Sequence, residues 1–201
     1  MIPNATVFIV DDDAAVRGGL SMQLEAAGFP VKAFASAEDF ITAICPAVIG
    51  CLVLDVRMPG MTGPDLQLEL ARRNINLPII FLSGHGDIPL AVKSIQAGAV
   101  DFLTKPVSGP VLIERIQMSL RLSAEQWEKD AENKILQEKM ATLTEREQEV
   151  LALALAGYSN KEIATRLGIS FRTVEHHRSR ILLRTGIDNL FKLAPLSRTS
   201  R

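Results

Sequence analysis

The first 122 residues alternate between short apolar runs and longer stretches of helical periodicity. Apolar runs of four to six residues are typical of buried strands, and they occupy Thr6–Val10, Phe29–Phe34, Cys51–Leu54, Leu77–Leu82 and Val100–Leu103. The helical stretches cover Ala14–Ala27, Ala37–Ile44, Pro64–Arg73, Pro89–Ala97 and Gly109–Leu122. This regular alternation predicts an α/β domain with a parallel sheet covered by helices on both faces.

Polar side chains follow four of the five predicted strands. A doubly wound sheet of the flavodoxin-like type has the strand order 2-1-3-4-5, so strands 1, 3, 4 and 5 are successive neighbours. Adjacent strands lie about 4.8 Å apart, and we therefore expect the residues that follow these strands to meet at one edge. They are Asp11, Asp12 and Asp13 after the first strand, Asp55 ending the third, Ser83 after the fourth and Lys105 after the fifth.

Three carboxylates at this edge, those of Asp11, Asp12 and Asp55, repel one another unless a cation lies among them. Oxygen ligands with open positions suit Mg²⁺, with Mn²⁺ as a substitute. Asp55 can then stay ionised and attack phosphorus, which gives an aspartyl phosphate. Lys105 is placed to pair with the phosphoryl group, and the Ser83 hydroxyl to hydrogen-bond another of its oxygens. Taken singly each residue has an ordinary explanation, and Asp13 is expected to be only a helix N-cap.

Four motifs carry these residues: VDDD at the first strand, LDVRMPGMTG around Asp55, LSGHGD after the fourth strand and GAVDFLTKP around the fifth. Together they resemble the receiver domain of bacterial two-component response regulators, which has a CheY-like fold, over about residues 7–122. The resemblance implies that a sensor histidine kinase phosphorylates Asp55. It also implies that Mg²⁺ is held by Asp11, Asp12, Asp55 and the main-chain carbonyl of Arg57.

The same resemblance assigns two further features. Ser83 and Phe102 would form a switch pair, although spacing alone favours Phe102 as a core residue. The peptide bond between Lys105 and Pro106 would be cis, a conformation whose free-energy cost is small only before proline. Phosphorylation would then change the face near Val92, Gln96 and Phe102 and permit homodimerisation.

Residues 123–141 are polar, lack Gly and Pro, and are rich in helix formers, which predicts a helical linker. Its apolar positions form an irregular stripe that favours a solvated spacer over a dimerising coiled coil. They are Trp127, Ala131, Ile135, Leu136, Met140 and, just beyond, Leu143. We therefore expect a receiver domain at 1–122, a linker at 123–141 and a second domain at 142–201.

The second domain is predicted to be all-α. Thr144 and Glu147 form a capping box for a helix that runs to about Ala156. Ser159 and Ser170 are N-cap residues for Asn160–Leu167 and Phe171–Arg184, with Gly168 in the turn between them. Two helices joined by such a turn form a helix-turn-helix, whose second helix enters the major groove of DNA. Its inward positions are predicted to be Val174, Ile181 and also His177.

The distribution of charge favours DNA as the partner of this domain. Residues 159–201 contain 9 basic and 3 acidic residues, a net charge of +6, whereas residues 1–122 contain 9 basic and 12 acidic residues, a net charge of −3. A basic segment on an acidic body indicates a polyanion partner. The outward positions of the last helix are expected to contact DNA: Arg172, Thr173, Glu175, His176, Arg178, Ser179 and Arg180. A helical hairpin that serves packing alone is the alternative.

The segment LTEREQEVLALALAGYSNKEIATRLGISFRTVEHHRSRI resembles the DNA-binding domain of the LuxR and NarL type, and the whole chain resembles FixJ-type transcriptional regulators. The resemblance implies that Asn160 and Lys161 contact phosphate and that Glu175, His176 and Ser179 face base edges. Many relatives have Lys in place of Glu175, so the base preference does not carry over. Pro195 is expected to end a final helix, Asp188–Ala194, and to leave LSRTSR disordered. In the family this helix often assists dimerisation on DNA, so its shortening puts in doubt a dimer surface at Leu190 and Leu193.

The expected function is therefore a response regulator whose phosphorylation promotes homodimerisation and sequence-specific binding to double-stranded DNA. RNA polymerase is a further candidate partner, and enzymatic activity is not expected beyond slow self-hydrolysis of the phosphate. Two other classes stay open: a phosphatase or phosphotransferase that uses the same Asp, and a DNA-binding or interaction protein that does not depend on phosphorylation.

The composition and the first residues indicate the cellular compartment of the protein. With 47% hydrophobic and 22% charged residues, and no apolar run as long as the roughly 18 residues of a membrane span, no membrane association is expected. The first residues lack a basic segment ahead of their apolar run, which argues against a signal peptide. We expect a cytoplasmic bacterial protein in which Cys45 and Cys51 are buried and reduced.

Overall fold

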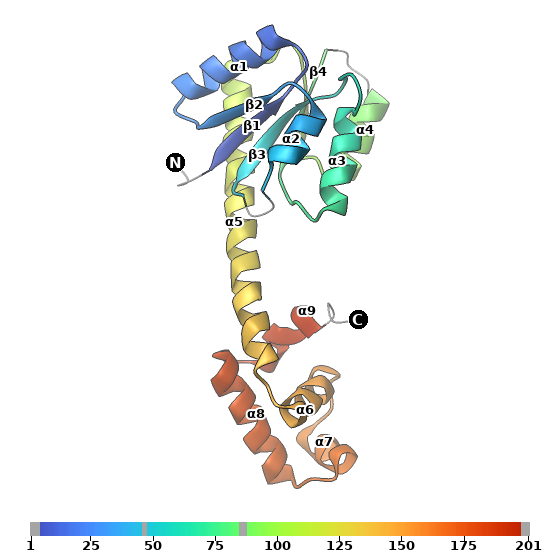
Figure 1. The fold of residues 1–201 in the computed structure, drawn as a ribbon. Coiled ribbons are helices and arrows are strands. Elements are labelled where there is room, and N and C mark those ends of the chain that lie inside the picture. Colours follow the sequence, from blue (N-terminus) through green and yellow to red (C-terminus); the bar gives the residue numbers. More distant parts are fainter. Residues whose placement is uncertain (1–4, 46–47, 85–87, 198–201) are drawn as a thin grey trace. The chain divides into compact units, whose positions relative to one another are not determined.

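The computed structural model describes residues 5–45, 48–84 and 88–197 (Figure 1). These residues form two compact units, which divide between Glu128 and Lys129. The boundary falls inside the segment expected to be a linker. Each unit has its own hydrophobic core. The units are therefore described separately.

The first unit contains a five-stranded parallel sheet in the order β2-β1-β3-β4-β5, which confirms the predicted fold class and strand order. Each strand lies within a few residues of its predicted position. The strands are β1 (Thr6–Val10), β2 (Val31–Phe34), β3 (Gly50–Asp55), β4 (Ile79–Ser83) and β5 (Asp101–Thr104).

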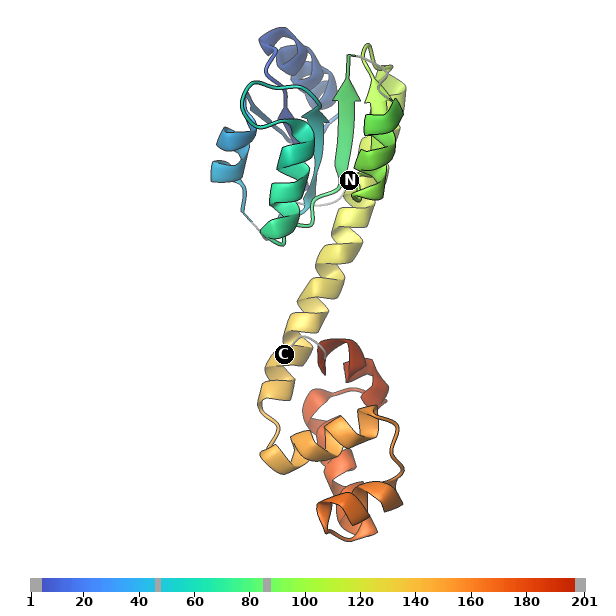
Figure 2. The ribbon, with the colours of Figure 1, turned by 90° about the vertical axis from the view of Figure 1, so that its right-hand side faces the viewer.

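Helices cover both faces of this sheet, as Figures 1 and 2 show. Phe8 and Val10 of β1 face the core that contains Leu66 and Leu70 of α3, whereas Val7 faces the core formed with α1 and α5. Alternate strand residues point to opposite faces, and both faces are buried here, which explains the nearly continuous apolar runs. The helices are α1 (Ala14–Ala26), α2 (Ala37–Ala43), α3 (Gly63–Arg72), α4 (Ile88–Gln96) and α5 (Gly109–Ala141).

Helix α5 is a single element of 33 residues, so the helix expected at Gly109–Leu122 and the helical linker form one continuous helix. In its first half Leu112, Ile116 and Leu120 are buried against the sheet. Near its end Leu136 and Met140 pack against the core of the second unit. Among the described residues no helix is both long enough and apolar enough to cross a membrane.

The second unit is all-α, as predicted. Two reciprocal capping boxes start its first helices, Thr144 with Glu147 and Ser159 with Glu162, because each side chain satisfies a backbone N–H that has no partner within the helix. The elements are α6 (Glu145–Leu155), α7 (Asn160–Leu167), α8 (Phe171–Thr185), the 3-10 helix η1 (Leu190–Leu193) and α9 (Ala194–Ser197).

The end of the chain differs from the prediction. Pro195 does not terminate a helix: it lies in the first turn of α9, where the N–H that proline lacks has no intrahelical partner in any case. Leu196 is buried, and so are Leu190 and Leu193, the two residues considered for a dimer surface. All three belong to the core of the unit. The last four residues, 198–201, lie outside the described part.

The two cysteines are both free, as expected. Only Cys51 is buried, in the middle of the sheet, and burial raises the pKa of its thiol to about 12. This keeps the thiol protonated and unreactive at neutral pH. Cys45 is exposed, contrary to the prediction.

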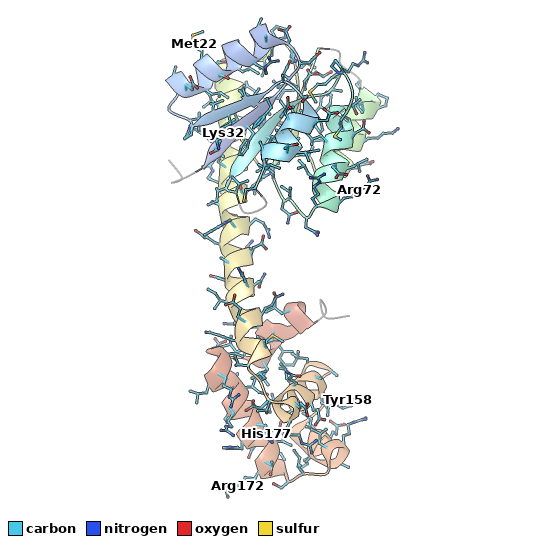
Figure 3. All side chains as sticks on the ribbon, viewed as in Figure 1. Met22, Lys32, Arg72, Tyr158, Arg172 and His177 are labelled. Carbon is cyan, nitrogen blue, oxygen red and sulfur yellow. The ribbon has the colours of Figure 1, made fainter. Side chains whose placement is uncertain are left out.

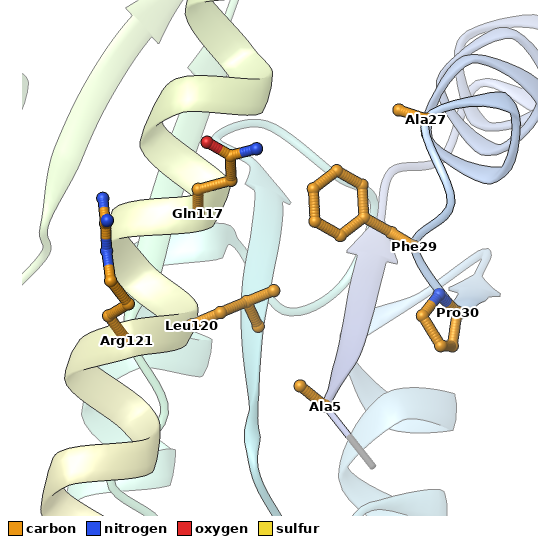
Figure 4. Close-up of a pocket in the computed structure, with 7 residues that line it drawn as sticks. All are labelled: Ala5, Ala27, Phe29, Pro30, Gln117, Leu120 and Arg121. Atoms are coloured by element: carbon orange, nitrogen blue, oxygen red, sulfur yellow. The ribbon is translucent and has the colours of Figure 1, made fainter. Parts of the chain in front are cut away.

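A pocket of about 330 Å³ opens in the first unit between α5 and the segments that precede β1 and β2 (Figure 4). Because Ala5 and Pro30 precede their strands, the pocket lies at the amino ends of the strands, the opposite edge from Asp55. Its lining is mostly apolar: Ala5, Ala27, Phe29, Pro30, Gln117, Leu120 and Arg121.

Candidate functional site

The carboxyl ends of β1 and β3 bring two acidic side chains together. The register pairs Val10 with Leu54, so Asp11 and Asp55 are in adjacent positions of neighbouring strands. Their exposures are only 2% and 7%. Two carboxylates so deeply buried need a positive charge or hydrogen-bond donors nearby.

Lys105 supplies that positive charge from the loop after β5. Its Nζ donates to Asp11 Oδ2 at 2.6 Å and also to Asp55 Oδ1. The backbone N–H of Lys105 donates to the Ser83 carbonyl at 2.7 Å, and the Lys105–Pro106 bond is cis, as the resemblance implied. Burial lowers the pKa of Lys105, but the hydrogen bonds and negative charges of Asp11 and Asp55 outweigh this and hold the pKa above its usual value.

The loop after β3 holds the second oxygen of Asp55. The backbone N–H of Arg57 donates to Asp55 Oδ2 at 2.7 Å. Glu38, on α2, accepts from the backbone N–H of Met61 at 3.0 Å and so ties this loop to a neighbouring helix. Sequence reasoning missed Glu38, because nothing in the sequence signals a contact across 23 positions.

Asp11 is fixed by its own loop and by α1. Its Oδ1 accepts from the backbone N–H of Asp13, and its main-chain carbonyl accepts from Arg17 Nη1 at 2.7 Å. Arg17 is another contact that the sequence did not signal. Asp13 is the N-cap of α1, as predicted, with its side chain accepting from Ala15 and Val16.

The expected meeting of three carboxylates is not observed. Asp12 is exposed, and within residues 5–45, 48–84 and 88–197 no three histidine, cysteine or acidic side chains are arranged to hold a metal ion. Asp11 and Asp55 nevertheless present the oxygen ligands that hard cations prefer, and they already share one cationic partner in Lys105. The donor chemistry of this pair therefore fits a divalent cation.

The residues expected to act as a switch lie on β4 and β5. Ser83 is buried, and Phe102 is partly buried with its ring centroid 6.1 Å from that of Phe81. Phe102, Val92 and Gln96 line an open hollow between α4 and β5. Val92 is 49% exposed, so this face carries accessible apolar surface. His85 and Asp87, part of the motif after β4, lie outside the described residues.

In the second unit α7 and α8 form the predicted helix-turn-helix. Gly168 ends α7 with a left-handed φ of 63°, which glycine adopts without steric cost. Val174 and Ile181 of α8 are buried, as predicted, and His177 is partly buried. Figure 3 shows Arg172 projecting from the amino-terminal end of α8. The exposed positions of α7 and α8 among the predicted DNA contacts are Lys161, Arg172, Glu175, His176, Ser179 and Arg180.

Three of the predicted DNA contacts are partly buried. Arg178 is not on the outward face: it is partly buried, and its Nη1 donates to Asn160 Oδ1 at 2.9 Å. Asn160 is partly buried as well. Thr173 is partly buried beside Ser170, with 2.8 Å between the two hydroxyl oxygens.

Comparison with known proteins assigns each unit to a family. Residues 7–117 match the model of the response regulator receiver domain, and residues 141–196 match that of bacterial regulatory proteins of the luxR family. The chain therefore belongs to the response regulators, as a receiver domain joined to a LuxR-type DNA-binding domain. It is a regulator of transcription, and it shares its two-domain architecture with FixJ-type proteins, as the motifs indicated.

Individual relatives share most of their length with this chain. TdiR of Thauera aromatica, a transcriptional regulatory protein, is 43% identical over 91% of this chain and 81% of its own. FixJ of Rhizobium meliloti is 45% identical over 88% and 87%. Among solved structures, the response regulator StyR is 42% identical, with a TM-score of 0.76 over 98% of this chain and 99% of its own.

Proposed function

We propose that Asp55 accepts a phosphoryl group from a sensor histidine kinase and that its phosphorylation controls DNA binding by the second unit. The observation that carries this proposal is the sharing of one ammonium, that of Lys105, by the two buried carboxylates of Asp11 and Asp55. The Lys105 ammonium can exchange one of these two carboxylates for a phosphoryl oxygen, because phosphate and carboxylate both attract lysine.

Each residue has a defined part in the transfer. Asp55 supplies the attacking carboxylate oxygen, and the kinase phosphohistidine loses its bond to phosphorus as the new O–P bond forms. Lys105 compensates charge on the phosphoryl oxygens. The Arg57 N–H, which donates to Asp55 Oδ2, keeps the carboxylate oriented.

Asp11 and Asp55, with Asp12 and the Arg57 carbonyl as the resemblance implies, would hold Mg²⁺, or Mn²⁺ in its place. The ion would supply positive charge that offsets the negative charge of the phosphoryl group. Asp12 is exposed and so can serve as a ligand on the solvent side.

The phosphoryl group is expected to act on Ser83 and Phe102. Ser83 ends β4 and Phe102 lies on β5 opposite Phe81, so a shift at Ser83 can pass to the α4–β5 face through packed neighbours. We propose that this face, around Val92 and Gln96, then forms a homodimer. Joining two basic domains in one dimer increases affinity for paired half-sites in double-stranded DNA.

This function does not need turnover, so we propose that the protein is not an enzyme beyond slow loss of its own phosphate. We also propose that it acts in the bacterial cytoplasm, with RNA polymerase as a further partner at the promoter.

The test is selection of duplexes from a random DNA pool by the full chain, with and without acetyl phosphate and Mg²⁺. The proposal predicts enrichment of a two-half-site sequence and tighter binding after phosphorylation. Equal affinity in both states would instead favour a DNA-binding protein independent of phosphorylation. Steady-state hydrolysis of a phosphate ester would favour an enzyme.

A further inference from the structure

The side chains of Asn160 and Arg178 connect the two helices of the helix-turn-helix. Asn160 is the first residue of α7, and Arg178 lies two turns into α8. Arg178 Nη1 donates to Asn160 Oδ1 at 2.9 Å. Both side chains are partly buried, whereas the neighbouring Lys161 is exposed.

The position of Arg178 along α8 explains why it makes this bond. An α-helix turns by about 100° per residue, which places Arg178 about 40° from Val174 and about 60° from Ile181 around the axis. Val174 and Ile181 are both fully buried. His176 and Ser179 lie on the other side, roughly 100–160° away from Arg178. Arg178 therefore belongs to the side of α8 that faces the domain, and not to the side that would enter a groove.

The chemistry of the two groups fixes the orientation of Asn160. A guanidinium has donors only, so the Asn160 atom that faces Arg178 must be the amide oxygen. The Asn160 amide nitrogen, with its two N–H donors, then points away from Arg178. Without Arg178 the amide could turn over and present either atom, because its two ends are nearly equal in size.

We propose that Arg178 is a positioning residue for DNA binding: it holds the Asn160 amide so that Nδ2 donates to a backbone phosphate, and does not bind phosphate itself. This inference rests on the proposed DNA-binding function. It assigns to Arg178 a role different from that of the exposed Arg172 and Arg180. A phosphate oxygen accepts hydrogen bonds only, so only one orientation of the Asn160 amide serves the contact.

The experiment measures binding of the full chain to a fluorescent mixed-sequence duplex by anisotropy at several KCl concentrations. Asn160→Ala and Arg178→Ala should each weaken binding on the order of tenfold, the size expected for a hydrogen bond to a charged group. The double variant should bind no more weakly than Asn160→Ala, because both changes remove the same contact. Lys161→Ala with Arg178→Ala should instead be additive.

Two measurements separate positioning from the alternatives. The slope of log Kd against log[KCl] should stay unchanged in Arg178→Ala, whereas loss of a direct cation–phosphate contact lowers it by about 0.9. Asn160→Asp keeps an oxygen for Arg178 but offers phosphate no donor. It should therefore melt no lower than the wild type and bind DNA more weakly than Asn160→Ala, because it adds repulsion from phosphate to the loss of the donor. Arg178→Lys, which also only donates, should restore part of the affinity.

Additive losses for Asn160→Ala and Arg178→Ala, together with a lower salt slope, would overturn the inference and make Arg178 a phosphate contact. Wild-type affinity in both single variants, with weaker binding in Lys161→Ala, would overturn it while leaving the proposed function intact. No binding of any duplex by the wild-type chain, phosphorylated or not, would overturn both.

Discussion

Lys105 Nζ lies 2.6 Å from Asp11 Oδ2, which joins the loop after β5 to the loop after β1. The same ammonium also donates to Asp55, at the end of β3 between them. One ammonium is thus shared by two buried carboxyl groups. The site should therefore respond to an added cation and to a change at Lys105.

Replacing Lys105 with Met should destabilise the receiver unit on the order of 3 kcal/mol, because it leaves two buried carboxylates without their cation. Added Mg²⁺ should restore more stability to this variant than it adds to the wild type, since the ion can take over the lost charge compensation. Thermal melts with and without MgCl₂ measure both effects. Lys32→Met, at an exposed position of β2, is the matched control. Equal responses to Mg²⁺ in the wild type and Lys105→Met would contradict this account.

Asp55→Asn should abolish incorporation of phosphate from acetyl phosphate, because the amide is a far weaker nucleophile than the carboxylate. Radiolabelling or intact mass spectrometry measures the incorporation. Asp39→Asn, at an exposed position of α2, should label like the wild type. Persistent labelling of Asp55→Asn would mean that another residue is the acceptor.

Val92→Glu should prevent dimerisation of the phosphorylated protein, because a charge on the α4–β5 face must lose its water when that face is covered. Sedimentation velocity with and without phosphodonor gives the apparent mass. Leu68→Glu is a suitable control, since Leu68 is a 53% exposed leucine on α3. A wild-type phosphoprotein that stays monomeric would refute the proposed dimer.

Acid should weaken the second unit through Glu147. Burial raises the pKa of this carboxyl, but hydrogen bonds from Thr144 and the charges of Arg184 and Arg180 outweigh burial and hold the pKa below its ordinary value of 4.5. The stabilisation is therefore present above pH 4.5 and is lost as pH falls through the lowered pKa.

In the Glu147→Gln variant, the backbone amide hydrogens of α6 and α8 should accordingly exchange with solvent faster than in the wild type at neutral pH. The difference should shrink below pH 4.5, after correction for the intrinsic exchange rate. Glu145→Gln, an exposed first-turn residue of α6, should behave like the wild type. A difference that does not change with pH would exclude ionisation of Glu147 as the cause.

Arg180→Ala should weaken DNA binding and lower the salt slope by about 0.9, because an exposed guanidinium of α8 is expected to contact phosphate. Anisotropy titrations over a range of KCl give the slope. Arg72→Ala, which removes an exposed charge of the receiver unit, should leave it unchanged. An unaltered slope in Arg180→Ala would remove this residue from the interface.

Local sequence signals proved reliable where the structure depends on local physics. The apolar runs located all five strands, and the capping residues Asp13, Thr144, Ser159 and Ser170 start the helices predicted for them. Pro195 misled the prediction, because its effect depends on its position within a helix: it would break an interior turn but is tolerated in the first one.

The sequence by itself determined the parallel sheet, its strand order, the acidic and basic residues at the strand ends, and the helix-turn-helix, because period, capping and turn chemistry act over a few residues. Only the tertiary structure decided which partners these side chains take. Lys105 meets Asp11 across 94 positions, Arg178 turns to Asn160, and Leu190 and Leu193 are buried. Such contacts depend on how distant segments pack, and no local pattern records them.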